Sequence, residues 1–589
     1  MKFFLDLLSN EISTAFEKAG YNSDLGKVNV SNRPDLCEYQ CNGAMAGAKI
    51  YKKAPIVIAN EVAKFLLDSD IFEKVDVVAP GFINLNVNSK FLCKYVSDMS
   101  HEEKFGINLP SEPKTYIVDY GGANVAKPLH VGHLRSAVIG ESVKRIIKYM
   151  GNNVIGDVHL GDWGLQMGLV IAELKVRKPE LPYFDDNFNG EYPTEPPFTI
   201  SDLEEIYPFA SAKSKENPDF KKEAMAETYK LQNGNPGSLA LWNHIMNVSK
   251  IDLKKNYDNL SVEFELWNGE STVQYLIPEM VEELKNGGYA YISDGALVVD
   301  VKEETDTKEI PPCIILKSDG ASLYNTTDLA TIKEREAKYN PDGIVYVTDK
   351  RQDLYFEQVF RCARKTGISG KNTKLVHIGF GTVNGKDGKP FKTRDGGVMR
   401  LEYLINDIYE EMLKKILEGR EMSKEESEEI SKIVSIAALK YGDLSNQASK
   451  DYIFDVDRFT SFEGDTGPYI LYTIVRIKSI LKKFEKNGGK ADECDIPESV
   501  SGSYEKSLLM KIIGYNAMME NAFEELAPHK ICAYIYDLAN VFNSMYHETK
   551  ILSEENENIK KGYIAELKTV LGIMDGALEC LGFTAPDKM

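Results

Sequence analysis

The sequence predicts an α/β protein in which a Rossmann-type parallel sheet, interrupted by an insertion, follows a small α+β unit and precedes an all-helical unit. Three observations predict this arrangement. Residues 115–158 show a strand, turn, helix and strand pattern; a polar, proline-rich stretch separates it from further strand-like runs; and only helical periodicity remains beyond about residue 400. A chain of 589 residues has room for about three to four domains.

The first unit is expected to span residues 1–110. Its opening run, MKFFLDLLSNEISTAFEKAG, predicts an amphipathic helix, because the acidic residues within it would be excluded from the apolar core of a signal peptide. Alternation over Gly81–Asn88 predicts a strand, and Phe91–Met99 predicts a helix. Two prolines in the segment 107–114 then mark a domain boundary.

The second unit is expected to span residues 111–400. It starts with a strand at Thr115–Tyr120, a helix at Val131–Met150 that Gly151 closes, and a strand at Asn153–Val158, which is the pattern of a parallel nucleotide-binding sheet.

Residues 175–300 are interpreted as an insertion between two halves of this sheet. The chain is polar and proline-rich between about 178 and 236, and helical patterning resumes only at Leu239–Asn259. The second half of the sheet is expected at Cys313–Leu316, Gly343–Val347 and Leu375–Phe380, with a helix near Leu354–Arg364.

The remaining chain is predicted to be helical. A linking region is expected at 401–455 and a helical domain at 456–589. The clearest periodic helices are Glu402–Leu417, Ser423–Tyr441, Pro468–Glu485 and His529–Tyr546.

The most informative segment is NVAKPLHVGHLR, residues 124–135. His130 and His133 flank Gly132 at the start of the first helix after a strand, where free N–H groups and the helix dipole favour anions. Gly132 would let a base approach the backbone, and both imidazoles together with Lys127 can donate hydrogen bonds to phosphoryl oxygens. Two alternatives remain: a two-histidine metal site, for which no acidic ligand stands at a zincin-like spacing, and a pair of core histidines.

HVGH in this setting resembles the HIGH signature of class I aminoacyl-tRNA synthetases, and VDYGGANVAKPLHVGHLRSAVIG is similar to the arginyl family in particular. The resemblance continues through GDWGLQMG, DGASLYNTTD and GDTGPY to LGFTAP near the end of the chain. It covers nearly the whole chain, most weakly in the first unit and the insertion. It implies a ligase that converts arginine and ATP to arginyl-adenylate and pyrophosphate, and then esterifies the 2′-hydroxyl of the terminal adenosine of tRNA-Arg.

The resemblance also implies the residues that hold arginine. A guanidinium has five donors and therefore requires carboxylates and other acceptors in a matching arrangement. In the family, the residues equivalent to Asp119, Asn124, Tyr324, Asp328 and Gln352 contact the amino acid. We expect Asp328 to bind the guanidinium, Asn124 and Gln352 to hold the amino acid, and Tyr324 to close the pocket. The family often has a glutamate where Asp119 stands.

A second class I signature, a lysine-bearing loop, resembles GKPFKTRDGG at Gly388–Gly397. We expect Lys392 to bind ATP, with Arg394 beside it in a catalytic role. The usual second lysine is Thr393 here, and the resemblance implies that Lys127 compensates for it. A basic loop in solvent is the alternative.

The helical C-terminal domain resembles the anticodon-binding domain of the family. Basic tracks contact phosphates, and aromatic side chains stack on unpaired bases. We expect Tyr469, Arg476 and Lys482 to contact tRNA, with Tyr472 and Tyr546 as further stacking candidates. A solvated helix face and core aromatics are the alternatives. The basic track comprises Arg476, Lys478, Lys482, Lys483, Lys486 and Lys490.

Composition limits the partners and the location. The formal charge of −20 argues against indiscriminate nucleic-acid binding, and the sequence has no stretch of the ~20 apolar residues that cross a bilayer. Scattered cysteines fit a reducing cytoplasm, and Cys37 and Cys41 have no matching second pair, so we expect no structural zinc. We expect a monomer, with Mg²⁺ accompanying the ATP triphosphate rather than held in a protein cage.

Four rival functions stay open. Synthetases for cysteine or for glutamate would need thiol ligands or a basic pocket. A small nucleotidyltransferase would need no helical RNA-binding domain, and a non-enzymatic tRNA-binding protein would need no intact HVGH.

Overall fold

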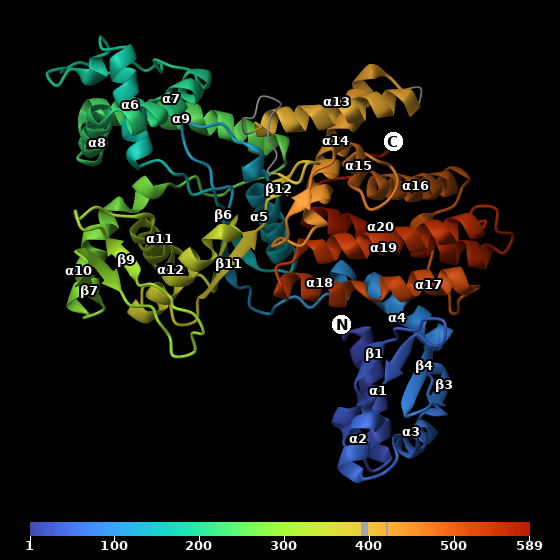
Figure 1. Ribbon diagram of the computed structural model, residues 1–589. Coiled ribbons are helices and arrows are strands. Elements are labelled where there is room, and N and C mark those ends of the chain that lie inside the picture. The colour runs from blue at the N-terminus through green and yellow to red at the C-terminus, as the bar shows by residue number, and fades with distance from the viewer. Residues whose placement is uncertain (390–398, 420–421) are drawn as a thin grey trace.

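The computed structural model describes residues 1–389, 399–419 and 422–589, and Figure 1 shows how their elements are arranged. A parallel sheet lies near the centre of the molecule. The N-terminal unit extends from the helical C-terminal part, and the helices of residues 165–259 lie at the opposite corner of the view. The predicted α/β class, with a parallel sheet and a helical C-terminal part, is confirmed.

The N-terminal unit is a four-stranded antiparallel sheet, in the order β1-β2-β4-β3, packed against helices. The expected amphipathic helix is present, and it buries Leu8, Ile12 and Phe16 along one face. The expected strand and second helix are present as β4 and α4. The elements are α1 (Phe4–Lys18), β1 (Val28–Val30), β2 (Tyr39–Cys41), α2 (Gly43–Tyr51), α3 (Pro55–Ala63), β3 (Phe72–Val78), β4 (Phe82–Val87) and α4 (Ser89–His101).

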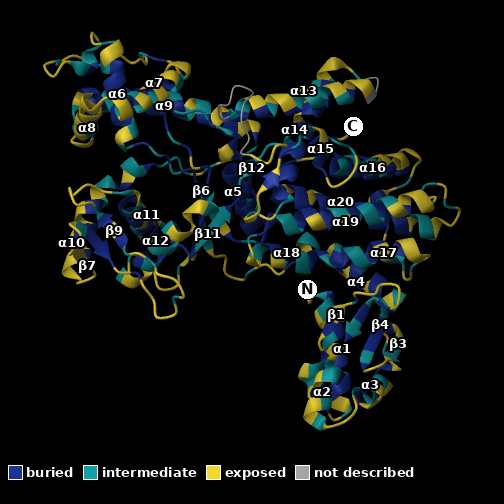
Figure 2. Cartoon of the chain, viewed as in Figure 1, coloured by how far each residue is buried: buried dark blue, intermediate teal, exposed yellow. Residues whose placement is uncertain are grey.

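The central sheet has four parallel strands in the order β11-β10-β5-β6. Helix α5 (Val131–Tyr149) connects β5 to β6, and nearly all of its side chains are buried, because it lies between the sheet and the helical part (Figure 2). The strand, helix and strand predicted for residues 115–158 are therefore confirmed. The strands are β5 (Thr115–Asp119), β6 (Asn153–Asp157), β10 (Gly343–Asp349) and β11 (Lys374–Phe380).

The run Cys313–Leu316 does not belong to the parallel sheet, so that prediction is wrong. It forms β9 and pairs antiparallel with β8 (Ala296–Val299), which pairs with β7 (Ala290–Ser293). Asp294 and Gly295 between β7 and β8 both have positive φ, 48° and 83°, as tight two-residue hairpins require. This hairpin offers β9 a free edge, and a short apolar run suits either sheet. The neighbouring helices are α10 (Ile277–Asn286), α11 (Tyr324–Tyr339) and α12 (Asp353–Thr366).

The polar stretch between residues 178 and 236 contains two helices that the sequence reading missed, α7 (Ile200–Glu216) and α8 (Pro218–Gln232). Thr199 and Asp202 form a capping box at the start of α7, and Asn217 caps α8 with a proline at its first position. Pro218 thus starts α8, and Pro208 lies inside α7 without ending it. The helices before and after these two are α6 (Leu165–Arg177) and α9 (Pro236–Asn259).

The C-terminal part is helical, and the four helices predicted there are present as α13, α14, α16 and α19. One short strand, β13 (Tyr452–Ile453), pairs with β12 (Val383–Asn384). Among the described residues, no helix combines the length and apolar character needed to cross a membrane. The helices are α13 (Leu401–Gly419), α14 (Lys424–Leu444), α15 (Val456–Phe459), α16 (Gly467–Lys486), α17 (Ser503–Ile512), α18 (Tyr515–Glu524), α19 (Pro528–Glu548) and α20 (Glu557–Leu581).

A buried ion pair fixes α5 against the helical part. Arg135 Nε lies 2.8 Å from Asp443 Oδ1 on α14, and the two side chains are 1% and 0% exposed. The same guanidinium donates to the carbonyls of Gly381 and Lys450. The orientation of α5 therefore depends on residues more than 240 positions away in the sequence.

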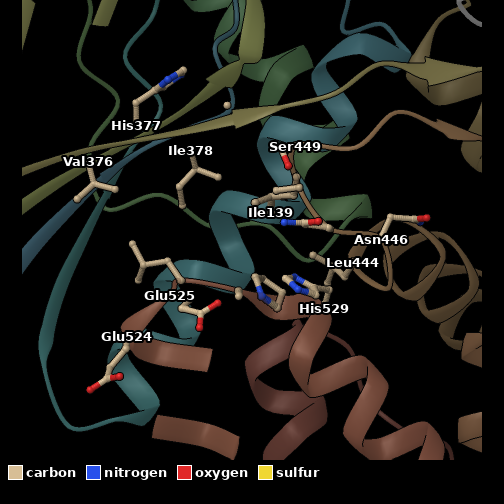
Figure 3. A pocket seen from close by; sticks show the side chains of 16 residues that line it. Ile139, Val376, His377, Ile378, Leu444, Asn446, Ser449, Glu524, Glu525 and His529 are labelled. Atoms are coloured by element: carbon tan, nitrogen blue, oxygen red, sulfur yellow. The ribbon is translucent and has the colours of Figure 1, made fainter. Parts of the chain in front are cut away.

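A pocket of about 360 Å³ lies where the edge strand β11 meets the helical part (Figure 3). Val376 and Ile378 line it on one side, and Glu524, Glu525 and His529 line it on the other. None of the described residues that line this pocket is one of the predicted site residues, so the candidate site lies elsewhere.

Candidate functional site

The HVGH turn forms the N-terminal end of α5. His130 is the N-cap: its Nδ1 accepts a hydrogen bond from Gly132 N at 3.0 Å, and His133 Nδ1 accepts one from His130 N at 3.1 Å. Each imidazole thus satisfies a backbone amide near the start of the helix. The two ring centroids lie 3.9 Å apart, so the histidines form one compact surface.

These capping bonds decide which ring nitrogen carries the proton. A nitrogen that accepts a hydrogen bond carries no hydrogen, so the neutral rings of His130 and His133 are protonated at Nε2. Burial lowers the pKa of His133 to about 3, and burial together with Lys127 lowers the pKa of His130. At neutral pH the turn therefore carries two uncharged Nε2–H donors, which suit phosphoryl oxygens.

The turn is also held from its other side. His130 forms an antiparallel bridge with Arg400, Val131 N donates to Met399 O at 3.0 Å, and Leu401 N donates to Leu129 O at 2.9 Å. A Cβ at Gly132 would lie 2.7 Å from the ring of His130, so a larger residue there would displace that ring. The position of the His130 ring therefore requires a glycine at residue 132.

One face of α11 supplies the next part of the site. Tyr324, Asp328, Thr331 and Arg335 follow one another at helical spacing, and Thr331 Oγ1 lies 3.4 Å from His159 Nε2 at the end of β6. Tyr324, the first residue of the helix, is 73% exposed, whereas Arg335 is 2% exposed. The face therefore runs from solvent down to the carboxyl ends of the strands.

Arg335 joins the ends of β5 and β6. Its Nη2 donates to Asp119 Oδ2 at 2.6 Å and to Asp157 Oδ2 at 2.7 Å. Burial raises the pKa of Asp119 although Arg335 opposes the rise; for Asp157, His159 and Arg335 outweigh burial and lower the pKa. Asp119 thus shares its carboxylate with an internal guanidinium.

Asp119, Asp157 and His159 are also the one group among the described residues whose ligand atoms are close enough for a metal ion, within 4.8 Å of one another. The guanidinium of Arg335 already bonds to both carboxylates and supplies the positive charge there. Cys37 and Cys41, which we did not expect to bind zinc, contact different partners. Cys37 Sγ contacts Ser31 Oγ, and Cys41 Sγ contacts Leu25 O.

Asp328 and Glu270 are two carboxyl groups whose charges interact, and this pair is called the acidic pocket below. Tyr355 donates its hydroxyl hydrogen to Asp328. Burial raises the pKa of Asp328 to about 6; burial, Asp162 and Asp328 raise the pKa of Glu270 to about 7. A cation placed near either carboxyl group would favour its ionised form. This environment suits the guanidinium of a ligand.

Glu270 was missed because it lies within the predicted insertion. Its segment runs alongside β6: Leu160 N donates to Asn268 O at 2.8 Å, and Glu270 N donates to Leu160 O at 3.1 Å. Nothing in the local pattern marks this extension of the sheet. His159 and Arg335 were also missed, although the 324, 328, 331, 335 spacing could have found Arg335.

The other predicted arginine contacts lie at the same edge of the sheet. Asn124 follows β5 and forms a bridge with Gly161; a Cβ on Gly161 would lie 2.3 Å from Asn124 Oδ1. Gln352 ends a short 3-10 turn after β10 and is exposed. Ligands of open α/β sheets bind at the carboxyl ends of the strands, which is where these residues lie.

Of the two lysine-bearing parts of the predicted site, the structure describes the one around Lys127 and not most of the signature loop. Lys127 lies just before the HVGH turn, with its Nζ 4.2 Å from the ring centroid of Tyr207 on α7. Lys392 and Arg394, with most of the predicted loop, lie outside the described residues.

The predicted tRNA contacts divide between two places. A groove of about 810 Å³ on the helical part is lined by Arg476 and Lys482, and the Arg476 guanidinium lies 4.9 Å from the ring centroids of both Tyr472 and Tyr546. Tyr469 does not line this groove; its hydroxyl donates to Asn540 at 2.7 Å, between α16 and α19. The structure thus brings Arg476 and Lys482 together without Tyr469.

Comparison with known families agrees with this architecture. Residues 96–456 match the class I tRNA synthetase (R) catalytic domain, residues 470–589 the DALR anticodon binding domain, and residues 6–87 the arginyl tRNA synthetase N-terminal domain. The fold and the histidine turn at the end of the parallel sheet therefore define a class I aminoacyl-tRNA synthetase.

Comparison with individual relatives shows which family of class I synthetases the chain belongs to. The chain is 61% identical to an arginine–tRNA ligase of Agathobacter rectalis and 55% identical to one of Alkaliphilus oremlandii, covering 100% of both chains in each case. The chain belongs to the arginyl-tRNA synthetase family. The crystal structure of arginyl-tRNA synthetase from Plasmodium falciparum matches with a TM-score of 0.81 at 25% identity, over 100% of both chains. That of the Thermus thermophilus enzyme matches in fold, with a TM-score of 0.79 at 20% identity and the same coverage.

Proposed function

We propose that this protein activates L-arginine with ATP, releasing pyrophosphate, and transfers the arginyl group to the 2′-hydroxyl of the terminal adenosine of tRNA-Arg. The observation that carries the proposal is the acidic pocket at the end of the same strands that hold the neutral HVGH turn. A guanidinium bound at one and a triphosphate at the other would meet at the sheet edge.

Each predicted side chain has a role in this proposal. Asp328 and Glu270 bind the guanidinium, Asn124 and Gln352 hold the amino acid, and Tyr324 covers the pocket. Asp119 completes the arginine site from its position beside Arg335.

The ATP half of the site uses the histidine turn. His130 and His133 donate from Nε2 to the phosphates, Gly132 keeps the turn open, and Lys127 adds positive charge. Lys392 and Arg394 act from the signature loop. Magnesium accompanies the triphosphate, and no zinc is needed.

The tRNA is held by the helical part. Arg476 and Lys482, together with Tyr472 and Tyr546, offer cations and ring faces in one groove, which suits unpaired bases. Tyr469 contributes from beside this groove. The protein acts as a monomer in the cytoplasm.

We also propose a domain division that follows the sequence reading: 1–110, 111–400 with the insertion at 175–300, 401–455 and 456–589. In its support, the antiparallel sheet lies within residues 28–87 and the parallel strands lie between residues 115 and 380.

An ATP–pyrophosphate exchange assay with each amino acid, with and without tRNA, tests the function. We expect exchange only with arginine, and only when tRNA is present. Three results would refute this function and support one of its rivals. They are exchange with glutamate or cysteine, exchange without any amino acid, and no exchange under any condition.

A further inference from the structure

Two side chains on one face of the insertion helix α7 reach the basic residues that border the HVGH turn. Glu204 and Tyr207 stand three positions apart, so they project from the same side of the helix. Figure 1 shows α7 with α9 in the part of the molecule formed by the insertion. The insertion thus contacts the proposed ATP site directly.

Tyr207 contacts the lysine before the turn. Lys127 Nζ lies 4.2 Å from the ring centroid of Tyr207, within the range in which an ammonium is attracted to an aromatic face. The backbone before this lysine is fixed as well, because Ala126, with φ of 60°, donates its N–H to Ser249 Oγ on α9 at 2.9 Å. Both the backbone and the side chain around Lys127 are therefore held by the insertion.

Glu204 contacts the arginine on the other side of the turn. Arg400 Nη2 lies 2.5 Å from Glu204 Oε2, and the backbone of Arg400 bridges to His130. One helix face thus holds a cation on each side of the histidines.

We propose that Tyr207 is a positioning residue for Lys127, which it holds ready for the triphosphate; this inference rests on the proposed ATP site. A lysine side chain has many rotamers, and confining it before the ligand arrives reduces the entropy lost on binding. The ring covers one side of the ammonium only, so N–H donors remain for phosphoryl oxygens.

Direct titration with a non-hydrolysable ATP analogue tests this role, together with pyrophosphate exchange in the presence of tRNA. Tyr207→Leu keeps an apolar side chain of similar length but removes the ring face. We expect the Kd for the analogue and the KM for ATP to rise roughly fivefold, which is the effect of a cation–π contact of ordinary strength. The KM for arginine should stay within about twofold of the wild type.

Two further variants separate positioning from packing. Tyr207→Phe keeps the ring face, so it should restore analogue binding to within about twofold of the wild type. Phe209→Leu is the matched control on the same helix, because Phe209 lies against Arg177 and Lys213 instead of Lys127. We expect it to leave analogue binding unchanged.

The coupling to Lys127 is tested by a double-mutant cycle. In a Lys127→Met background, Tyr207→Leu should cause no further loss of analogue affinity. Four results would each overturn the assignment. Two concern single variants: unchanged or tighter analogue binding in Tyr207→Leu, or an equal loss in Phe209→Leu. The other two are failure of Tyr207→Phe to restore binding, and additive losses in the double-mutant cycle. Analogue binding is measured without arginine chemistry, so absence of exchange in the wild type would refute the proposed function without deciding the role of Tyr207.

Discussion

The HVGH turn and the acidic pocket lie at the same edge of one sheet but are built differently. The two side-chain hydrogen bonds that cap the turn join residues within His130–His133, and the rings there are kept neutral by lowered pKa values. The acidic pocket takes Asp328 from α11, Tyr355 from α12 and Glu270 from a segment beside β6, and its carboxyl pKa values are raised.

This difference shows how one site can serve two ligands of opposite charge. The neutral N–H donors of the turn can bind a triphosphate and do not attract arginine strongly. The carboxyl groups of the acidic pocket resist ionisation, but they attract a guanidinium strongly once it lies beside them. The side-chain caps of the turn are local, whereas the groups of the acidic pocket come from three segments that are far apart in the sequence.

The largest expected effect is on the pocket. Asp328→Asn keeps the size of the side chain and an acceptor for Tyr355 but removes the charge that faces the guanidinium. We expect arginine-dependent exchange to fall by about 10³-fold, which corresponds to about 4 kcal/mol. The affinity for tRNA, measured by filter binding, should stay within a few-fold; near-normal exchange would refute the role of Asp328.

The second prediction concerns the anchor of the turn. Arg135→Met leaves Asp443 buried without its partner, so we expect a loss of about 3 kcal/mol in the free energy of unfolding. Urea unfolding followed by tryptophan fluorescence measures this loss, since Trp163, Trp242 and Trp267 all lie between α5 and α10. The double variant Arg135→Met/Asp443→Leu should recover more than half of the loss; equal losses in both variants would show that the pair itself matters little.

The two halves of the site should respond differently to pH. Arginine binds best when Asp328 and Glu270 are both ionised, and their raised pKa values of about 6 and about 7 place that change between pH 6 and 8. We expect the affinity for arginine, measured by calorimetry, to rise roughly tenfold or more from pH 6 to pH 8.

In the ligand-free protein, the free energy of unfolding changes with pH in the direction opposite to the affinity for arginine. Raised carboxyl pKa values mean that the folded state binds more protons than the unfolded state, so stability is lost as the pH rises through about 6 and 7. Arginine should therefore raise Tm more at pH 8 than at pH 6. Binding of adenosine, which the proposed ATP site places at the turn with its neutral histidines, should stay constant; a pH step in adenosine affinity would contradict the contrast between the two halves.

The smallest expected effect is on the turn itself. Gly132→Ala places a Cβ against the ring of His130 and should shift the Nε2–H donor, raising the KM for ATP roughly fivefold while leaving the KM for arginine unchanged. Gly164→Ala is the control, because a Cβ there meets nothing within 4 Å. Equal KM values for ATP in the two variants would show that His130 does not depend on Gly132.

The sequence alone predicts the turn better than the pocket, for a physical reason. His130, Gly132 and His133 lie within one helical turn, so their spacing already contains the geometry of the site. Asp328 could be reached only through the family resemblance, and Glu270 was hidden in a segment whose pairing with β6 leaves no periodic pattern.

The same distinction explains the errors in the fold. The helices α7 and α8 were missed because their prolines were read as breakers, although Pro218 is the first residue of α8 and Pro208 lies inside α7 without ending it. Cys313–Leu316 was assigned to the wrong sheet because a four-residue apolar run does not specify its partner strand.

A crystal structure with L-arginine and a non-hydrolysable ATP analogue tests the central claim most directly. The account predicts the guanidinium within about 3 Å of carboxylate oxygens of Asp328 and Glu270, and phosphate oxygens at the same distance from Nε2 of His130 or His133. A guanidinium bound away from these two carboxylates, or a triphosphate away from the start of α5, would contradict it.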